Sequence, residues 1–130
     1  WVKSVTFEAD PVVKWSPDAI DLILDQPVWP WVEILTSHAG ASGAVADLLV
    51  QGGVHGLVVA CTGNGSLHHD LEASLLRAQA AGVDVVRATR CALGQVLPKA
   101  GDQLPHSNGL SPVKARVSLL LERLAAQAGL

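Results

Sequence analysis

The chain of 130 residues has no methionine and no tyrosine, one phenylalanine and two cysteines. Two cysteines are too few for the disulfide framework of a small secreted scaffold. Nine basic against twelve acidic side chains, with no dense basic block, argue against nucleic acid as the main partner. Because no apolar run approaches the roughly 20 residues of a membrane-spanning helix, we expect no membrane partner either.

The absence of methionine includes the first position, where the chain reads Trp1-Val-Lys. A translation product needs an initiator, so we expect an excised or processed piece of a longer protein. A cleaved signal peptide would leave a similar start. The composition is that of a folded globular domain, since 49% of the residues are hydrophobic and 16% are charged.

Residues 1–30 differ from the rest of the chain and predict a linker or N-terminal extension before a domain at residues 31–130. Prolines interrupt this segment at Pro11, Pro17, Pro27 and Pro30. An imperfect alternation from Val2 to Phe7 predicts a short strand, and Ser16-Pro17 predicts the start of a short helix. The apolar side of that helix would consist of Ile20, Leu22, Ile23 and Leu24. We expect the large side chains of this region to pack against further protein, namely Trp15, Trp29 and Trp31.

From residue 31 onward, predicted strands and helices alternate. Strands are predicted at residues 32–37, 56–60 and 83–89, and helices at 44–51, 67–81 and from Ser111-Pro112 onward. We expect Ser42 to cap the first of these helices, Gly52-Gly53 to end it, and Gly82 to end the second. The predicted apolar sides are Val45, Leu48 and Leu49 in the first helix, Leu71, Leu75, Leu76 and Ala78 in the second, and Val113, Val117, Leu120, Leu121 and Leu124 in the last.

This order predicts a small α/β domain with three layers, in which helices flank both faces of a parallel sheet of three to four strands (Rossmann-like). Its central stretch is residues 56–69, a continuously apolar strand followed by a turn of glycines, Gly63-Asn-Gly65-Ser66. Glycine and asparagine tolerate the positive φ angles of such a turn. The turn should lie at the carboxyl edge of the sheet, where ligands usually bind.

The other two strands should end at the same edge, at Ser37-His38 and at Thr89-Arg-Cys91. Together the three strand ends offer hydroxyls, an imidazole, a guanidinium, two thiols and the amides at a helix start. Such a helix start favours a carboxylate or a phosphate. A dinucleotide site is disfavoured, because His68 replaces the third glycine of the fingerprint and no acidic residue clearly ends the next strand.

No metal site and no cofactor are expected either. Cys61, Cys91, His68 and His69 could be imagined as ligands, but they lack the spacing of known metal motifs. A nucleophilic triad with His38 lacks the accompanying elbow motif. We interpret three acids as solvated helix faces, namely Asp47, Glu72 and Glu122. Arg87 would turn outward or pair with one of them, while Arg90 is placed for an anion or a domain interface.

Four runs, in this order and spacing, together carry a resemblance to a known family. They are His38-Ala-Gly-Ala-Ser, Gly56-Leu-Val-Val-Ala-x-x-Gly-Asn-Gly-Ser, Val85-Val-Arg-Ala-Thr-Arg90 and Leu110-Ser-Pro-Val-Lys-Ala-Arg-Val117. Over roughly residues 30–125 the chain resembles the smaller C-terminal domain of bacterial-type L-asparaginases. The Gly-Asn-Gly-Ser and Ser-Pro-x-Lys-Ala-Arg runs together make the resemblance specific.

The resemblance implies that no catalytic residue lies in this chain, because the threonine nucleophile belongs to a larger N-terminal domain. Ser66 would contact the substrate, with Asn64 shaping the turn, and the domain would complete the site of a neighbouring subunit in a homo-oligomer. Some members also use a glutamate from the loop after the third strand. That position falls here near Ala100 or Gly101, with Asp102 an approximate substitute, which leaves the preference between asparagine and glutamine open.

Two functions from different classes follow. The first is the C-terminal domain of an asparaginase-like amidohydrolase, inactive alone, acting on a small amino-acid amide together with its N-terminal catalytic domain. The alternative is a stand-alone α/β module that binds a small ligand or a protein. A third, weaker possibility is phosphate or nucleotide binding at the helix start. The free thiols favour a cytoplasmic location.

Overall fold

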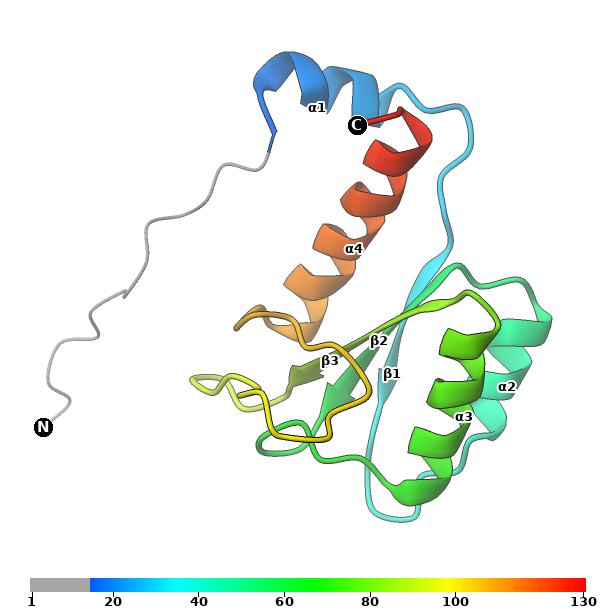
Figure 1. The fold of residues 1–130 in the computed structure, drawn as a ribbon, viewed down its shortest axis with the longest axis vertical. Coiled ribbons are helices and arrows are strands. Elements are labelled where there is room, and N and C mark those ends of the chain that lie inside the picture. The colour runs from blue at the N-terminus through cyan, green and yellow to red at the C-terminus, as the bar shows by residue number, and fades with distance from the viewer. Residues whose placement is uncertain (1–14) are drawn as a thin grey trace, which may run out of the picture.

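The computed structural model describes residues 15–130, so the strand predicted from Val2 to Phe7 lies outside the described residues. Figure 1 shows the order of the elements. The helices are α1 (Pro17–Leu24), α2 (Ala44–Gln51), α3 (His69–Ala80) and α4 (Pro112–Gln127), and the strands are β1 (Val32–Thr36), β2 (Gly56–Cys61) and β3 (Asp84–Thr89). Within the described residues, no helix is both long and apolar enough to cross a membrane.

The three strands form one parallel sheet in the order β1-β2-β3. All six residues of the central strand β2 are buried, which explains its apolar run without alternation. Beyond β3, His106 forms an isolated parallel bridge with Arg87, so the long loop after β3 returns to the position of a fourth strand. The predicted range of three to four parallel strands is therefore confirmed.

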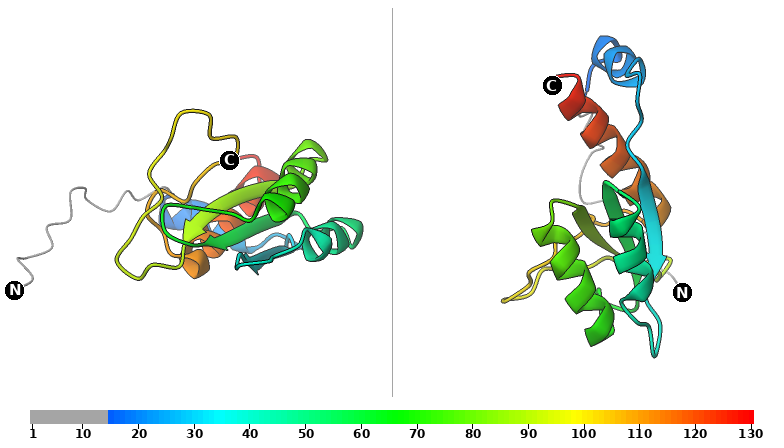
Figure 2. Two further views of the ribbon diagram at one scale, coloured as in Figure 1. Left: turned by 90° about the horizontal axis from the view of Figure 1, so that it is seen from below. Right: turned by 90° about the vertical axis from the view of Figure 1, so that its right-hand side faces the viewer.

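Helices cover both faces of the sheet, as predicted. Figures 1 and 2 show α2 and α3 side by side on one face and α4 on the other, with α1 against the C-terminal end of α4. Because both crossovers advance in the same direction from β1 to β3, their helices share a face. The core consists of two clusters, one on each face: Leu57, Val59, Leu71 and Leu75 belong to the first, and Ile23, Val58, Leu119 and Leu124 to the second.

The apolar stripe predicted for α4 is partly wrong. Val113 and Val117 are 67% and 46% exposed. Leu120 and Leu124 are buried as predicted, and Leu121 packs against the core from a partly buried position. The other buried residues of α4 are Ala115, Leu119 and Ala125. A single stripe fails because α4 has two partners. Its first half packs on the sheet, and its second half reaches past the sheet to α1 (Figure 1).

The stripe predicted for α2 is also partly wrong, since Val45 and Leu48 are 54% and 65% exposed. Ala46 is the buried residue of this helix, and Leu49 packs against the core from a partly buried position. The stripe predicted for α3 is confirmed, with Leu71, Leu75 and Ala78 buried and Leu76 partly buried. In α1 only Ile23 is buried, because this short helix packs mainly along α4.

Helix ends differ from the predictions in detail. Gly43, and not Ser42, is the N-cap residue of α2, although the Ser42 hydroxyl accepts a hydrogen bond from the Ala44 amide at 3.4 Å. The helix predicted from residue 67 begins at His69, with His68 as its N-cap. Gly82 follows the C-cap of α3 with a φ of 91°, a conformation that glycine adopts without strain.

Candidate functional site

The carboxyl ends of all three strands lie at one edge of the sheet. The parallel registers align Thr36 with Ala60 and Cys61 with Thr89. Two backbone hydrogen bonds extend this alignment beyond the strands, from the Ser37 amide to Ala60 and from the Arg90 amide to Cys61. The predicted meeting of the strand ends is therefore confirmed, and Ser37 is buried there while His38 and Arg90 are exposed.

The turn after β2 is closed by the backbone of its own ends. The Ser66 amide donates to the Thr62 carbonyl at 2.9 Å, and the Thr62 amide donates to the Ser66 carbonyl at 3.4 Å. Gly63 and Gly65 have φ angles of 49° and 80°, in the region that favours glycine. The Ser66 side chain is exposed, and among residues 15–130 its hydroxyl makes no hydrogen bond. The Ser66 hydroxyl therefore faces solvent from a turn whose backbone is held by hydrogen bonds.

The side chain of Asn64 connects this turn to the long loop after β3. The Leu97 amide donates to Oδ1 of Asn64 at 2.6 Å, and Nδ2 of Asn64 donates to the Leu97 carbonyl at 3.4 Å. The amide of Asn64 therefore pairs with both backbone groups of one residue, much as a neighbouring strand would. Both polar ends of this side chain are committed within the domain.

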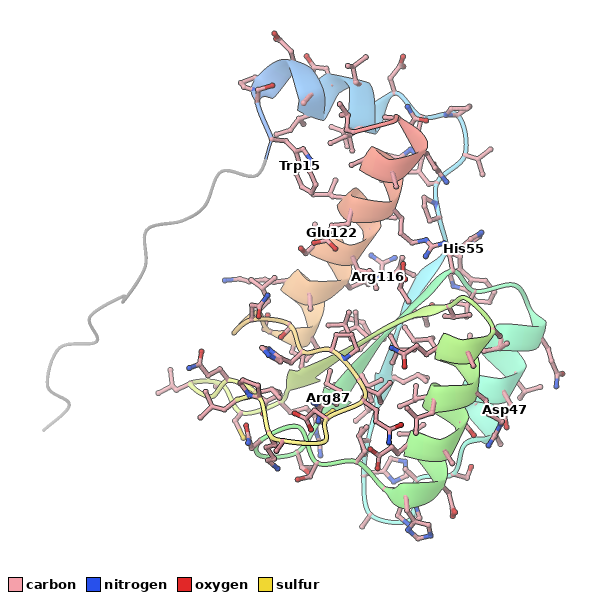
Figure 3. The ribbon with its side chains drawn as sticks, viewed as in Figure 1. Trp15, Asp47, His55, Arg87, Arg116 and Glu122 are labelled. Carbon is pink, nitrogen blue, oxygen red and sulfur yellow. The ribbon has the colours of Figure 1, made fainter. Side chains whose placement is uncertain are left out.

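Arg87 lies at the centre of the same region, which the sequence did not predict. Its side chain points from β3 into the loop (Figure 3) and is only 8% exposed. Nε donates to the Leu104 carbonyl at 3.1 Å, Nη1 donates to the Gly65 carbonyl at 3.4 Å, and Nη2 lies 2.9 Å from Oδ2 of Asp102. The expectation that Arg87 turns outward or pairs with a helix acid is wrong. A charged residue within an apolar strand was the signal that it has a counter-ion within the fold.

Asp102 is the counter-ion of Arg87. Its Oδ2 also accepts a hydrogen bond from the Lys99 amide at 2.9 Å. The Arg87 guanidinium beside it, followed by the hydrogen bond from the Lys99 amide, lowers the pKa of the Asp102 carboxyl below its ordinary value. The carboxylate therefore stays ionised near neutral pH and is held inside its own loop.

The acids on the helices divide into two kinds. Asp47 on α2 is not simply solvated, because both its carboxylate oxygens accept from Nη2 of Arg77 on α3 at 3.2 Å. The same Nη2 donates to the buried Ser74 hydroxyl at 2.6 Å. This network joins the two helices on one face of the sheet. Glu72 and Glu122 are exposed, as predicted.

The start of α3 is a poor anion site. Nδ1 of His68 accepts a hydrogen bond from the Asp70 amide at 3.3 Å and so occupies one free donor of the first turn. Asp70 and Glu72 add negative charge to that turn. Among residues 15–130, the group of side chains that could hold a metal is His68, His69 and Asp70, which includes neither cysteine. All three are adjacent in sequence at a helix N-terminus, which repels a cation.

The two thiols of this edge differ in environment. Cys61 is fully buried at the end of β2 and donates to the Val59 carbonyl, whereas Cys91 is exposed. Burial raises the pKa of the Cys61 thiol to about 11, and the nearby Arg87 charge offsets only part of this. Since the thiolate is the reactive form, Cys61 should be inert in the folded protein.

We expect a thiol reagent at pH 8 to label Cys91 rapidly and Cys61 only after unfolding. Counting labelled thiols before and after adding denaturant tests this. An unfolded thiol ionises near pH 8.5, but native Cys61 holds its proton until about pH 11, so this thiol's contribution to stability is lost as pH rises between those values. Equal labelling rates for both thiols in the native protein would contradict the burial of Cys61.

A hollow of about 1760 Å³ lies away from the turn, between the outer edge of β3, the segment 105–110 and α4. None of the turn residues lines it. Thr62, Gly63 and Ser66 of the turn are exposed.

Comparisons with known proteins identify the family of this chain. Residues 31–125 match the model of the Glutaminase/Asparaginase C-terminal domain family. The chain is 39% identical to L-asparaginase 2 of Bacillus subtilis (strain 168) over 95 residues, which are 71% of this chain and 25% of that protein. It is 37% identical to L-asparaginase 2 of Escherichia coli (strain K12) over 122 residues, 90% of this chain and 35% of that protein.

A solved structure shares the fold as well. The crystal structure of the probable cytoplasmic L-asparaginase from Campylobacter jejuni superposes with a TM-score of 0.69 at 32% identity, over 78% of this chain and 33% of that one. The chain thus spans about a quarter to a third of the length of these relatives. With three parallel strands, helices on both faces and a family match over residues 31–125, this chain belongs to the glutaminase/asparaginase C-terminal domain family.

Proposed function

We propose that this chain is the C-terminal domain of an asparaginase-like amidohydrolase, which converts L-asparagine and water to L-aspartate and ammonia. The observation that carries the proposal is the exposed hydroxyl of Ser66, held on a rigid turn within a domain of this family. A separate N-terminal domain of the same protein, joined through the segment 1–30, would supply the threonine nucleophile and form the acyl-enzyme.

The contribution of this domain would be to orient the substrate. A serine hydroxyl both donates and accepts, so Ser66 can hydrogen-bond to the carboxylate or to the ammonium group of an amino-acid amide. Asn64 belongs to the same turn and keeps it in place through its hydrogen bonds with Leu97. Such positioning accelerates a reaction by holding the amide carbon near the nucleophile.

The domain by itself should be inactive. His38, the imidazole at this edge, has its Nδ1 3.0 Å from the Ala39 carbonyl. Among residues 15–130, no hydrogen bond joins a hydroxyl or thiol to a histidine at the strand ends. A nucleophile without a base remains weak, so the reactive pair must lie elsewhere.

We further propose a homo-oligomer and a cytoplasmic location. α2 exposes Val45 and Leu48, apolar side chains of the kind that subunit interfaces cover. Both cysteines are free, which suits a reducing compartment. The neighbour from Campylobacter jejuni is a probable cytoplasmic L-asparaginase.

Ser66→Ala tests the proposed function in the intact protein, meaning the longer polypeptide that contains this chain. Loss of one hydrogen bond should raise the KM for asparagine roughly 2- to 10-fold. Ammonia release measures the effect. Ser111→Ala is the matched control, since this serine starts α4 on the other face of the sheet and makes no side-chain cap.

The purified 130-residue chain should release no ammonia from asparagine. Turnover by that chain, if it survives Ser66→Ala, would sink the proposal. An intact protein with equal KM values for wild type, Ser66→Ala and Ser111→Ala would remove Ser66 from the site. A start codon just upstream of Trp1 would favour the stand-alone binding module instead.

A further inference from the structure

We propose that Arg87 and Asp102 are positioning residues, an ionic latch between a buried guanidinium and a partly exposed carboxylate that holds the Gly63–Ser66 turn and the loop 94–104 as one rigid unit. This inference rests on the proposed function, because it assigns the latch the task of fixing Ser66 against the substrate. Neither residue needs to touch the substrate itself.

Several segments of the chain meet on the guanidinium of Arg87. From the middle of β3, Arg87 contacts the turn through the Gly65 carbonyl and the loop through the Leu104 carbonyl and Asp102. The backbone of Arg87 is tied to the loop as well: its amide donates to the Pro105 carbonyl, and its carbonyl accepts from the Ser107 amide. One residue therefore sets the distance between sheet, turn and loop.

A second set of contacts also joins the turn to the loop. The two hydrogen bonds between Asn64 and Leu97 join the tip of the turn to the loop, 33 residues apart in sequence. Next to them, Val96 is 3% exposed, and its Cγ1 lies 2.8 Å from where a Cβ on Gly65 would be. The loop thus packs directly on the backbone that precedes Ser66.

The contact between Arg87 and Asp102 depends on the negative charge of Asp102. A guanidinium with an 8% exposed side chain has lost most of its hydration, and a carboxylate at 2.9 Å compensates for that loss. The other charged group acting on this carboxylate is Lys99, which also carries the amide that donates to Asp102. It is a cation, so it cannot replace Asp102 as the counter-ion of Arg87.

The consequence for the site is geometric. Ser66 follows Gly65 directly, and the Gly65 carbonyl is the group that Arg87 holds. Displacing the guanidinium would therefore tilt the peptide plane before Ser66 and move its hydroxyl. Both contacts of Asp102, from Arg87 and from the Lys99 amide, are made by the same oxygen, Oδ2, which the latch therefore occupies.

Asp102→Asn in the intact protein tests the latch, because asparagine keeps the shape and can still accept from the Lys99 amide but carries no charge. The matched control is Asp84→Asn, which removes the ion pair with Arg123 at the opposite end of β3. Asp102→Glu is the conservative variant that restores the charge. Hydrogen exchange of the Leu97 and Lys99 amides and steady-state kinetics with asparagine are measured for each.

We expect Asp102→Asn to speed exchange at Leu97 roughly tenfold, since charge-assisted hydrogen bonds are the strong ones. KM should rise several-fold with a smaller change in kcat, and Asp102→Glu should recover part of both effects. Asp84→Asn should leave all of them unchanged. Unaltered exchange at Leu75 in α3, a fully buried position, verifies that the variants remain folded.

Two results would overturn the proposal. If Asp102→Asn and Asp84→Asn behave alike in exchange and KM, no latch exists. If Leu97 exchange rises but KM does not, in a protein where Ser66→Ala raises KM, the latch does not position Ser66. Failure of the proposed function looks different, because Ser66→Ala would then leave KM unchanged while Asp102→Asn still loosened the loop.

Discussion

Leu124→Ala should lower the free energy of unfolding by about 2–5 kcal/mol, whereas Val113→Ala on the same helix should change it by less than about 0.5 kcal/mol. Leu124 is completely buried in the cluster between α4, the sheet and α1, while Val113 is 67% exposed. Both variants shorten apolar side chains on one helix, and the few tenths of a kcal/mol by which leucine and valine differ in helix propensity are small beside the expected effect of burial.

The loss at Leu124 combines two effects. Transfer of the missing carbon atoms out of the core is unfavourable, and the cavity left behind forfeits dispersion contacts because neighbours relax only partly. Ile23 on α1 belongs to the same cluster, so α1 should loosen from α4 at the same time. Denaturant unfolding followed by tryptophan fluorescence measures the change. Equal losses for both variants would mean that the stripe predicted from the sequence alone is the buried one.

Gly43→Ala should lower the free energy of unfolding by about 1–3 kcal/mol, which is a large effect for one added methyl group. A Cβ at this position would overlap the Ser74 hydroxyl and lie 2.6 Å from its Cβ. The backbone of Gly43 has a φ of −78°, which any residue adopts, so the cost is steric and owes nothing to backbone strain.

Ser74 cannot move away without a further loss. It is 2% exposed, and its hydroxyl lies within the hydrogen-bond network of Asp47 and Arg77 that joins α2 to α3. Adding Ser74→Gly to Gly43→Ala removes both overlapping atoms, so the double variant should be more stable than the sum of the two single losses predicts. Thermal unfolding of the four proteins gives this coupling.

Gly53→Ala is the contrasting control, because it tests backbone strain without a clash. Gly53 has a φ of 86° and no atom within 4 Å of its would-be Cβ, so alanine there should cost about 1 kcal/mol from the left-handed conformation alone. If Gly43→Ala costs no more than this and shows no coupling with Ser74, the close approach of α2 and α3 is wrong.

Local sequence patterns predicted where the strands and helices lie. A run of apolar residues from Leu57 to Ala60 indicated a strand covered on both faces, and all of β2 is buried. Proline after Ser111 marked the start of α4, and paired glycines at 52–53 marked the end of α2. These signals are readable because strand periodicity, proline geometry and positive φ act within a few residues.

The faces that the helices bury were decided by the tertiary structure. Ala46 is buried in α2 where Val45 and Leu48 are exposed, although the two larger residues would gain more from burial. A small residue permits close packing against α3, and only the position of that neighbour makes this favourable. Likewise, α4 changes partner along its length, from the sheet to α1, which no periodic pattern reveals.

The features of the candidate site also fall into two groups, those that local sequence predicts and those that tertiary contacts decide. The sequence by itself determined that Gly63-Asn-Gly65-Ser66 forms a turn at the carboxyl edge of a parallel sheet, since glycine spacing and strand order are local and topological properties. Only the tertiary structure decided that Asn64 binds Leu97 and that Arg87 binds Asp102, because loop closure brings together residues whose separation no local rule specifies.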